Sequence, residues 1–180
     1  MHFTPDGRFG FTPERDQDSV AKVDLTTRRI VQRVDFPAGS KPYMLRVVPD
    51  GSAVWVQTAG TNENVILDPD TMRTIHTTAT GKGPVQSAFA PANGRYALIT
   101  HLDETFVLVH DRASGQEVQR IDVGGSQANI SFSPDGGTAF VTVTRRNEVA
   151  AIDMAELAVI GRVAAGSEPM GLVVFDPSAP

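Results

Sequence analysis

Three residues on one short stretch of this sequence could take part in metal or acid–base chemistry. His101, Asp103 and Glu104 bring an imidazole and two carboxylates together within four positions. These groups ligate metals, but a metal site needs three or four protein ligands that converge. The other histidines are His2, His76 and His110. Because the last two fall in expected strands, far along the blades from this stretch, we expect a solvated loop here, with no metal and no cofactor.

Cations at two kinds of position could instead bind an anion. Arg145 and Arg146 are adjacent, and guanidinium groups match the geometry of carboxylates and phosphates. Lys41 and Lys82 each precede an apolar segment at what we take to be equivalent places, which would direct two ammonium groups toward one opening. The candidate binding residues are therefore Lys41, Lys82, His101, Asp103, Arg145 and Arg146. The alternative is that these loop cations are simply solvated, and we identify no catalytic residue.

Four aspartates have the regular spacing of a structural device. Asp24, Asp68, Asp111 and Asp153 each close an apolar run, at intervals of 44, 43 and 42 residues. A catalytic group is needed once, whereas a turn-capping group is needed in every repeat, and Asp side chains bond nearby backbone amides in turns. We therefore expect these carboxylates to be structural.

The whole chain repeats with a period of about 43 residues. Prolines in similar turns are separated by 44, 42, 43 and 43 residues, at Pro5, Pro49, Pro91, Pro134 and Pro177. Glycines keep the same period, at Gly39, Gly81, Gly124 and Gly166. We divide the single domain approximately into repeats 1–42, 43–84, 85–128 and 129–169, with a closing strand over 170–176.

Each repeat contains four short apolar segments bounded by Pro, Gly, Asn and Asp, which is typical of strands and turns. In the third repeat they cover 85–90, 96–100, 105–110 and 117–123. Four-stranded antiparallel units of this length are characteristic of the blades of an all-β β-propeller. Large residues recur on the second strand and are expected to fill the space between blades: Phe11, Trp55, Leu98 and Phe140.

The fourth repeat resembles a known family repeat. Ser133-Pro134-Asp135-Gly136, the apolar run to Thr142, and Asn147 to Asp153 are similar to the YVTN-type, WD40-like propeller repeat of about forty residues, found in bacteria. The resemblance implies an exported, periplasmic or secreted protein with seven or eight blades, although the first residues of this chain lack the charged and apolar regions of a signal peptide; a cytoplasmic protein is the alternative. Related propellers include lactonases and haem-binding or quinoprotein-associated domains.

Four repeats are fewer than that family's usual ring, and three explanations remain open. We favour the chain as part of a seven- or eight-bladed propeller. Alternatively, the segment 171–175 closes a four-bladed ring as the inner strand of the first blade, or two chains combine. Exposed blade edges would then support self-association by strand addition.

Composition and charge argue against several classes of function. The net charge of −5 argues against a nucleic-acid partner, which requires a basic surface. No apolar run is long enough to span a membrane, and the absence of cysteine excludes thiolate chemistry. We therefore expect a non-enzymatic module that binds a protein or a small anionic ligand. The alternative is a propeller enzyme or cofactor-bearing domain, lactonase-like or associated with haem or quinoprotein.

Overall fold

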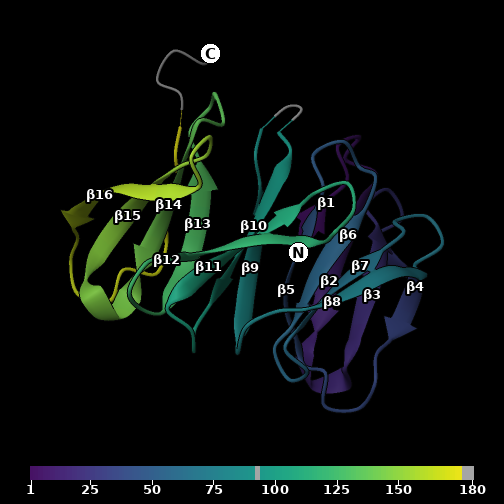
Figure 1. Ribbon diagram of the computed structural model, residues 1–180. Coiled ribbons are helices and arrows are strands. Elements are labelled where there is room, and N and C mark those ends of the chain that lie inside the picture. Colours follow the sequence, from purple (N-terminus) through teal and green to yellow (C-terminus); the bar gives the residue numbers. More distant parts are fainter. Residues whose placement is uncertain (92–93, 176–180) are drawn as a thin grey trace. The chain divides into compact units, whose positions relative to one another are not determined.

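The computed structural model describes residues 1–91 and 94–175 and consists almost entirely of strands (Figure 1). Ala92 and Asn93 of the third expected turn, and Asp176 of the expected closing strand, lie outside these residues. The strands form four antiparallel sheets of four, each in sequence order, which we call blades 1 to 4. The fold class expected from the repeat is therefore confirmed.

The strand bounds follow the repeat closely. Blade 1 contains β1 (His2–Phe3), β2 (Phe9–Glu14), β3 (Ser19–Asp24) and β4 (Arg29–Asp35), and blade 2 contains β5 (Pro42–Val47), β6 (Val54–Thr58), β7 (Glu63–Leu67) and β8 (Thr74–Ala79). Blade 3 contains β9 (Pro84–Phe89), β10 (Tyr96–His101), β11 (Phe106–Asp111) and β12 (Glu117–Asp122), and blade 4 contains β13 (Gln127–Phe132), β14 (Thr138–Val143), β15 (Glu148–Asp153) and β16 (Ala158–Ala164). Short 3-10 turns, Arg15–Gln17 and Thr144–Arg146, follow β2 and β14. No helix within 1–91 and 94–175 is long and apolar enough to cross a membrane.

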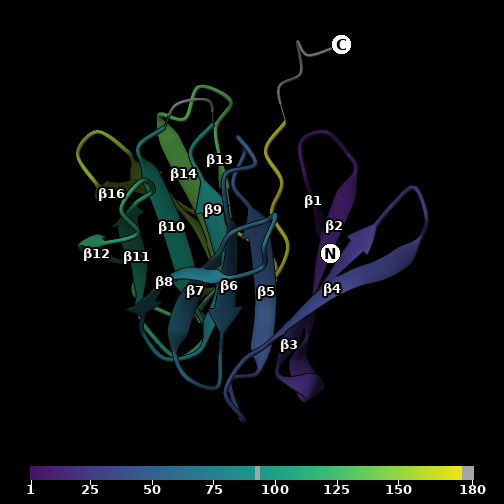
Figure 2. The same cartoon turned by 90° about the vertical axis from the view of Figure 1, so that its right-hand side faces the viewer.

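The chain divides into two compact units, residues 1–87 and 88–180, with the boundary inside β9. In the first unit, Figure 2 shows β1 to β4 as one sheet, and a single apolar cluster joins blade 1, through Phe11 and Val20, to blade 2, through Val54 and Leu67. In the second unit, an equivalent cluster joins Leu98 and Val109 of blade 3 to Val141 and Ile152 of blade 4. Period-two alternation along each strand places these side chains on one face.

The Pro-Asp-Gly turns form as their sequence predicts. Gly51 has φ of +77° and Gly136 of +74°, a region that a side chain rarely adopts. Their N–H groups donate to the carbonyls of Val48 and Ser133, at 2.8 and 2.9 Å. The recurring aspartates are also structural: Asp153 Oδ1 accepts the backbone N–H groups of two residues in its own turn, at 2.8 Å each, and the same arrangement occurs at Asp24, Asp68 and Asp111.

Two expectations differ from the structure. Residues 170–175 form no strand, and the inner position of blade 1 is occupied by β1, which pairs with Phe11 and Gly10 of β2. Phe11, Trp55 and Leu98 are buried as expected, but Phe140 is only half-buried. Its neighbours Ala139 and Val141 point into the cluster shared with blade 3, so Phe140 must point to the other face of blade 4.

Candidate functional site

The loops after the second strands and the links between blades meet at one end of each blade. In three blades the residue before the third strand has a left-handed backbone conformation, and its side chain bonds the loop to the link. We call this contact the Asx latch. Asp18 (φ +51°) accepts the backbone N–H groups of Gly39 and Lys41, at 2.7 and 2.6 Å. Asn62 does the same for Gly83 at 3.0 Å, and Asn147 for Glu168 at 2.9 Å. The latches fix the loop end, which carries all six candidate residues.

In blade 3 a residue of the link, rather than one of the loop, joins the two segments. The latch position is Thr105, and the residue that opens the next blade is Gln127 where the other links have proline. The fully buried Gln127 side chain accepts the N–H of His101 at 3.1 Å and donates to the carbonyl of Glu104 at 2.9 Å. It therefore holds the loop of blade 3 from the link side.

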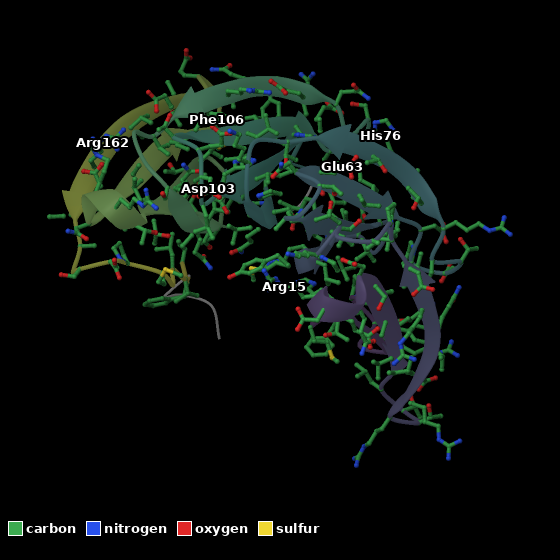
Figure 3. All side chains as sticks on the ribbon, turned by 90° about the horizontal axis from the view of Figure 1, so that it is seen from below. Arg15, Glu63, His76, Asp103, Phe106 and Arg162 are labelled. Carbon is green, nitrogen blue, oxygen red and sulfur yellow. The ribbon has the colours of Figure 1, made fainter. Side chains whose placement is uncertain are left out.

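His101 corrects one expectation, because it is the last residue of β10 and fully buried rather than on a solvated loop. Burial lowers the pKa of its imidazole from 6.5 to about 4, although a hydrogen bond to the backbone of Phe106 opposes this. The His101 and Phe106 rings are 5.3 Å apart. Asp103 is exposed on the loop that follows (Figure 3). In the described part of the chain, no group of three or more His, Asp or Glu side chains could hold a metal ion.

The two candidate arginines have different surroundings. Arg146 pairs through Nε with Glu148 Oε1 at 2.8 Å, and its aliphatic part covers the link between blades 3 and 4. A Cβ placed on Gly124 would lie 3.4 Å from Arg146 Cδ, so the small residue allows this close approach. Arg145 is exposed and forms no ion pair with any residue that the structure describes.

Glu148 and Arg162, which the sequence did not single out, form a charged cluster with Arg146. Glu148 Oε1 also accepts Arg162 Nη1 at 2.5 Å, and the same Nη1 donates to the carbonyl of Val123 at 2.8 Å. Burial alone would raise the pKa of Glu148, but the hydrogen bonds from both arginines outweigh it and hold the pKa below its usual value. Figure 3 shows Arg162 on the outer part of blade 4. Both Glu148 and Arg162 are charged residues at positions that the repeat does not mark, and this was the signal in the sequence that could have identified them.

The expected equivalence of Lys41 and Lys82 is wrong. Lys41 precedes Pro42 and has φ of +48°, and the residue with these properties before Pro84 is Gly83, with φ of +63°. Lys82 therefore corresponds to Ser40, one position earlier in the link. Both lysines are exposed on the first unit, but the repeat does not direct their ammonium groups to one point.

A shallow hollow of about 350 Å³ lies at the other end of blades 1 and 2, beside the Pro-Asp-Gly turns. Its lining includes Asp6, Asp50 and Phe9. Asp6 and Asp50 each accept a backbone N–H two residues ahead, of Arg8 and Ser52. These two carboxylates thus serve the turns, and the lining of the hollow contains none of the six candidate residues.

Comparison with known proteins supports the fold alone. No protein-family model matches the sequence, and no curated protein matches it, so the YVTN-type assignment stays a prediction. Among solved structures, hydrazine synthase of Kuenenia stuttgartiensis is 24% identical with a TM-score of 0.81, over 89% of this chain and 47% of that one. Dihydro-heme d1 dehydrogenase NirN in complex with DHE is 23% identical with a TM-score of 0.74, over 92% and 36%.

The β-propeller domain of Cps50 (Swd1) from Myceliophteria thermophila is 14% identical with a TM-score of 0.78, over 92% of this chain and 55% of that one. The chain thus spans about half or less of the length of these structures. The likenesses show that its sheets have the architecture of β-propeller blades, and they include both enzymes and a WD40-like domain.

Proposed function

We propose that this chain is a non-enzymatic binding module of the YVTN-repeat type and that it binds a small anionic group, a carboxylate or a phosphate, at the loop end of blade 4. The observation that carries the proposal is the charge arrangement around Glu148. Arg146 and Arg162 share one carboxylate oxygen, and Arg145, next to Arg146 in the turn Thr144–Arg146, has no carboxylate partner among the described residues.

The cluster retains positive charge after its own pairs are counted. Glu148 neutralises one of the three guanidinium groups. The carboxylate of Asp122, at the link between blades 3 and 4, is held by its own turn, where Oδ1 accepts the N–H of Gly124 at 2.8 Å. Arg146 and Arg162 are oriented by Glu148, so little side-chain freedom is lost when they meet a ligand. A ligand with two oxygen atoms matches the free fork of Arg145.

A binding role, rather than acid–base catalysis, agrees with the hydrogen bonding and ionisation of the carboxylates. The four recurring aspartates are held by turn amides, and backbone hydrogen bonds from Ser114, with Arg95 beside it, lower the pKa of Asp111 to about 2. Carboxylates held ionised in this way are poor proton donors at neutral pH. Export to the periplasm is part of the proposal on the YVTN resemblance alone, and cell fractionation of the natural protein tests it.

Calorimetric titration with citrate and with inorganic phosphate tests the anion site. We expect saturable binding that weakens with added salt and falls at least tenfold in Arg145→Ala, since a guanidinium–anion contact contributes roughly 1.5–3 kcal/mol. The matched control is Arg29→Ala, which removes an exposed arginine at the start of β4, at the turn end of blade 1. Equal loss in both variants, or no binding by the unaltered chain, would contradict the proposal.

A cofactor-bearing domain is the second candidate, because one solved structure with this fold is a dihydro-heme d1 dehydrogenase in complex with DHE. Titration with haem, followed by absorption in the Soret region, separates the two. A saturable spectral shift that is lost in His101→Gln would favour the cofactor-bearing function. The full burial of His101 predicts no such shift, since the imidazole could reach a ligand only if β10 opened at its end.

A further inference from the structure

One backbone N–H at the loop end is bonded in the same way after three of the four blades. It belongs to the residue that precedes the proline of the link, and it donates to the side-chain oxygen of the Asx latch. The three pairs are Lys41 to Asp18 at 2.6 Å, Gly83 to Asn62 at 3.0 Å, and Glu168 to Asn147 at 2.9 Å. The acceptor is therefore a planar carboxylate or carboxamide group each time.

The link between blades 3 and 4 has the same spacing but not the acceptor. The carbonyl oxygens of Thr105 and Asn147, at equivalent positions, accept the N–H groups of Val123 and Ala165, at 2.8 Å each. Ser126 follows Val123 by three residues, as the donor to the latch follows Ala165. The side chain of Thr105 is exposed and forms no hydrogen bond with any residue that the structure describes. This link thus lacks the latch oxygen.

The N–H of Ser126 is left without an acceptor. Ser126 is 8% exposed, and neither its N–H nor that of Gly125 forms a hydrogen bond within the described part of the chain. The N–H of Gly124 differs, because Asp122 Oδ1 accepts it at 2.8 Å. A buried backbone donor normally has a partner, and successive N–H groups in a turn form concavities that bind anions. Gly125 and Ser126 therefore offer two adjacent donors to an external ligand.

Arg146 places positive charge beside these donors. A Cβ on Gly124 would lie 3.4 Å from Arg146 Nη1, and one on Gly125 would lie 3.4 Å from its Cγ, so glycine at both positions leaves room for the arginine. Among the described residues, Arg146 pairs with Glu148 through Nε alone, so both Nη groups remain available to donate. The nearby carboxylates are already engaged, Asp122 by Gly124 and Glu148 by two arginines.

We propose that the ligand of this site is a small carboxylic acid and that one carboxylate oxygen accepts the Ser126 N–H in place of the missing latch. The other oxygen accepts from the Nη groups of Arg146. The first link provides the template, since Asp18 is itself a carboxylate and accepts two backbone N–H groups there. A planar group fits because loop and link keep the spacing that an Asx side chain spans in the other blades. The inference rests on the proposed function, because it names the ligand class of the same site.

NMR titration of the unaltered, 15N-labelled chain with succinate tests the inference. We expect saturable shifts that are largest at the Ser126 and Gly125 amides, and a weaker response to inorganic phosphate, which is not planar. Thr105→Asn supplies the latch oxygen from within the chain, so succinate should bind roughly tenfold more weakly or worse, and the Ser126 amide should stop responding. The matched control is Thr26→Asn, the same change at an exposed threonine at the turn end of blade 1, which should bind like the unaltered chain.

Circular dichroism confirms that each variant is folded, and Thr105→Asp replaces Thr105→Asn if that variant is not. Full binding by the folded Thr105 variant, together with loss of binding in Arg145→Ala, would overturn this inference and leave the proposed function standing. Saturable binding without a shift at Ser126, or an equal response to phosphate, would also overturn it. No response of the unaltered chain to either anion would remove both the inference and the proposed function.

Discussion

The ammonium group of Lys22 lies 2.7 Å from the carbonyl oxygen of Pro69 and joins blade 1 to blade 2 inside the first unit. Lys22 is only 6% exposed and packs over the ring of Phe9, with Nζ 4.2 Å from the ring centre. The other blades have Ile66, Val109 and Ala151 at this position. A charge is therefore buried where the repeat has an apolar side chain, and a backbone carbonyl of the next blade stabilises it.

Replacing this lysine separates its packing from its hydrogen bond. Lys22→Met keeps an unbranched side chain over Phe9 but removes the donor to Pro69. We expect a loss of about 1–3 kcal/mol in the free energy of unfolding, the contribution of a hydrogen bond from a charged group. Urea denaturation measures it, and Lys41→Met, at an exposed lysine, should change stability by less than about 0.5 kcal/mol. Equal effects in the two variants would show that the bond to Pro69 contributes nothing.

The Asx latch makes a prediction about backbone conformation. Asn147 has φ of +56° and accepts the N–H of Glu168. Asn147→Gly keeps the conformation and loses the hydrogen bond, for a cost of about 1 kcal/mol. Asn147→Ala loses the bond and strains the backbone, which adds roughly 1 kcal/mol. In thermal and urea unfolding, Asn147→Ala should be less stable than Asn147→Gly. The reverse order of stability would mean that the left-handed conformation is not required.

The burial of His101 predicts a loss of stability in mild acid. Its pKa is about 4 in the folded chain, below the ordinary value of 6.5, so the unfolded chain binds the proton first as pH falls. The stability from a neutral His101 is complete above pH 6.5 and is lost between there and pH 4, about 3 kcal/mol in all. His2, whose pKa is lowered mainly by burial, adds to the same trend.

His101→Gln isolates this contribution. The variant keeps a polar side chain at the end of β10 without a group that titrates, so its unfolding free energy should depend less on pH between 6.5 and 4 than that of the unaltered chain. Urea denaturation at several pH values in this range gives both curves. If the two curves run parallel, His101 titrates normally in the folded protein and cannot be as buried as the structure has it.

Fold and site differ in how far the sequence predicts them. Turns and strands follow from local chemistry that recurs every 43 residues or so, and β9 to β12 begin and end within one residue of the expected bounds. The burial of His101 depends instead on Gln127, 26 residues away, which bonds to its backbone. The cluster around Glu148 could be recognised only in part, because Arg146 is two residues away in the chain but Arg162 meets Glu148 only once β15 and β16 pair.

Gly60 tests how closely the loop of blade 2 approaches its link. A Cβ at Gly60 would lie 1.8 Å from the carbonyl oxygen of Gly39, and the N–H of Gly60 donates to the carbonyl of Ser40 at 2.9 Å. Gly60→Ala must therefore displace backbone rather than a flexible side chain, and we expect a loss of about 3 kcal/mol, at the upper end of the cost of overpacking. Gly161→Ala is the control, since a Cβ there meets no atom within 4 Å. Urea unfolding should show a change below about 0.5 kcal/mol for the control, and an equally small change at Gly60 would mean that the loop and the link lie further apart than the structure shows.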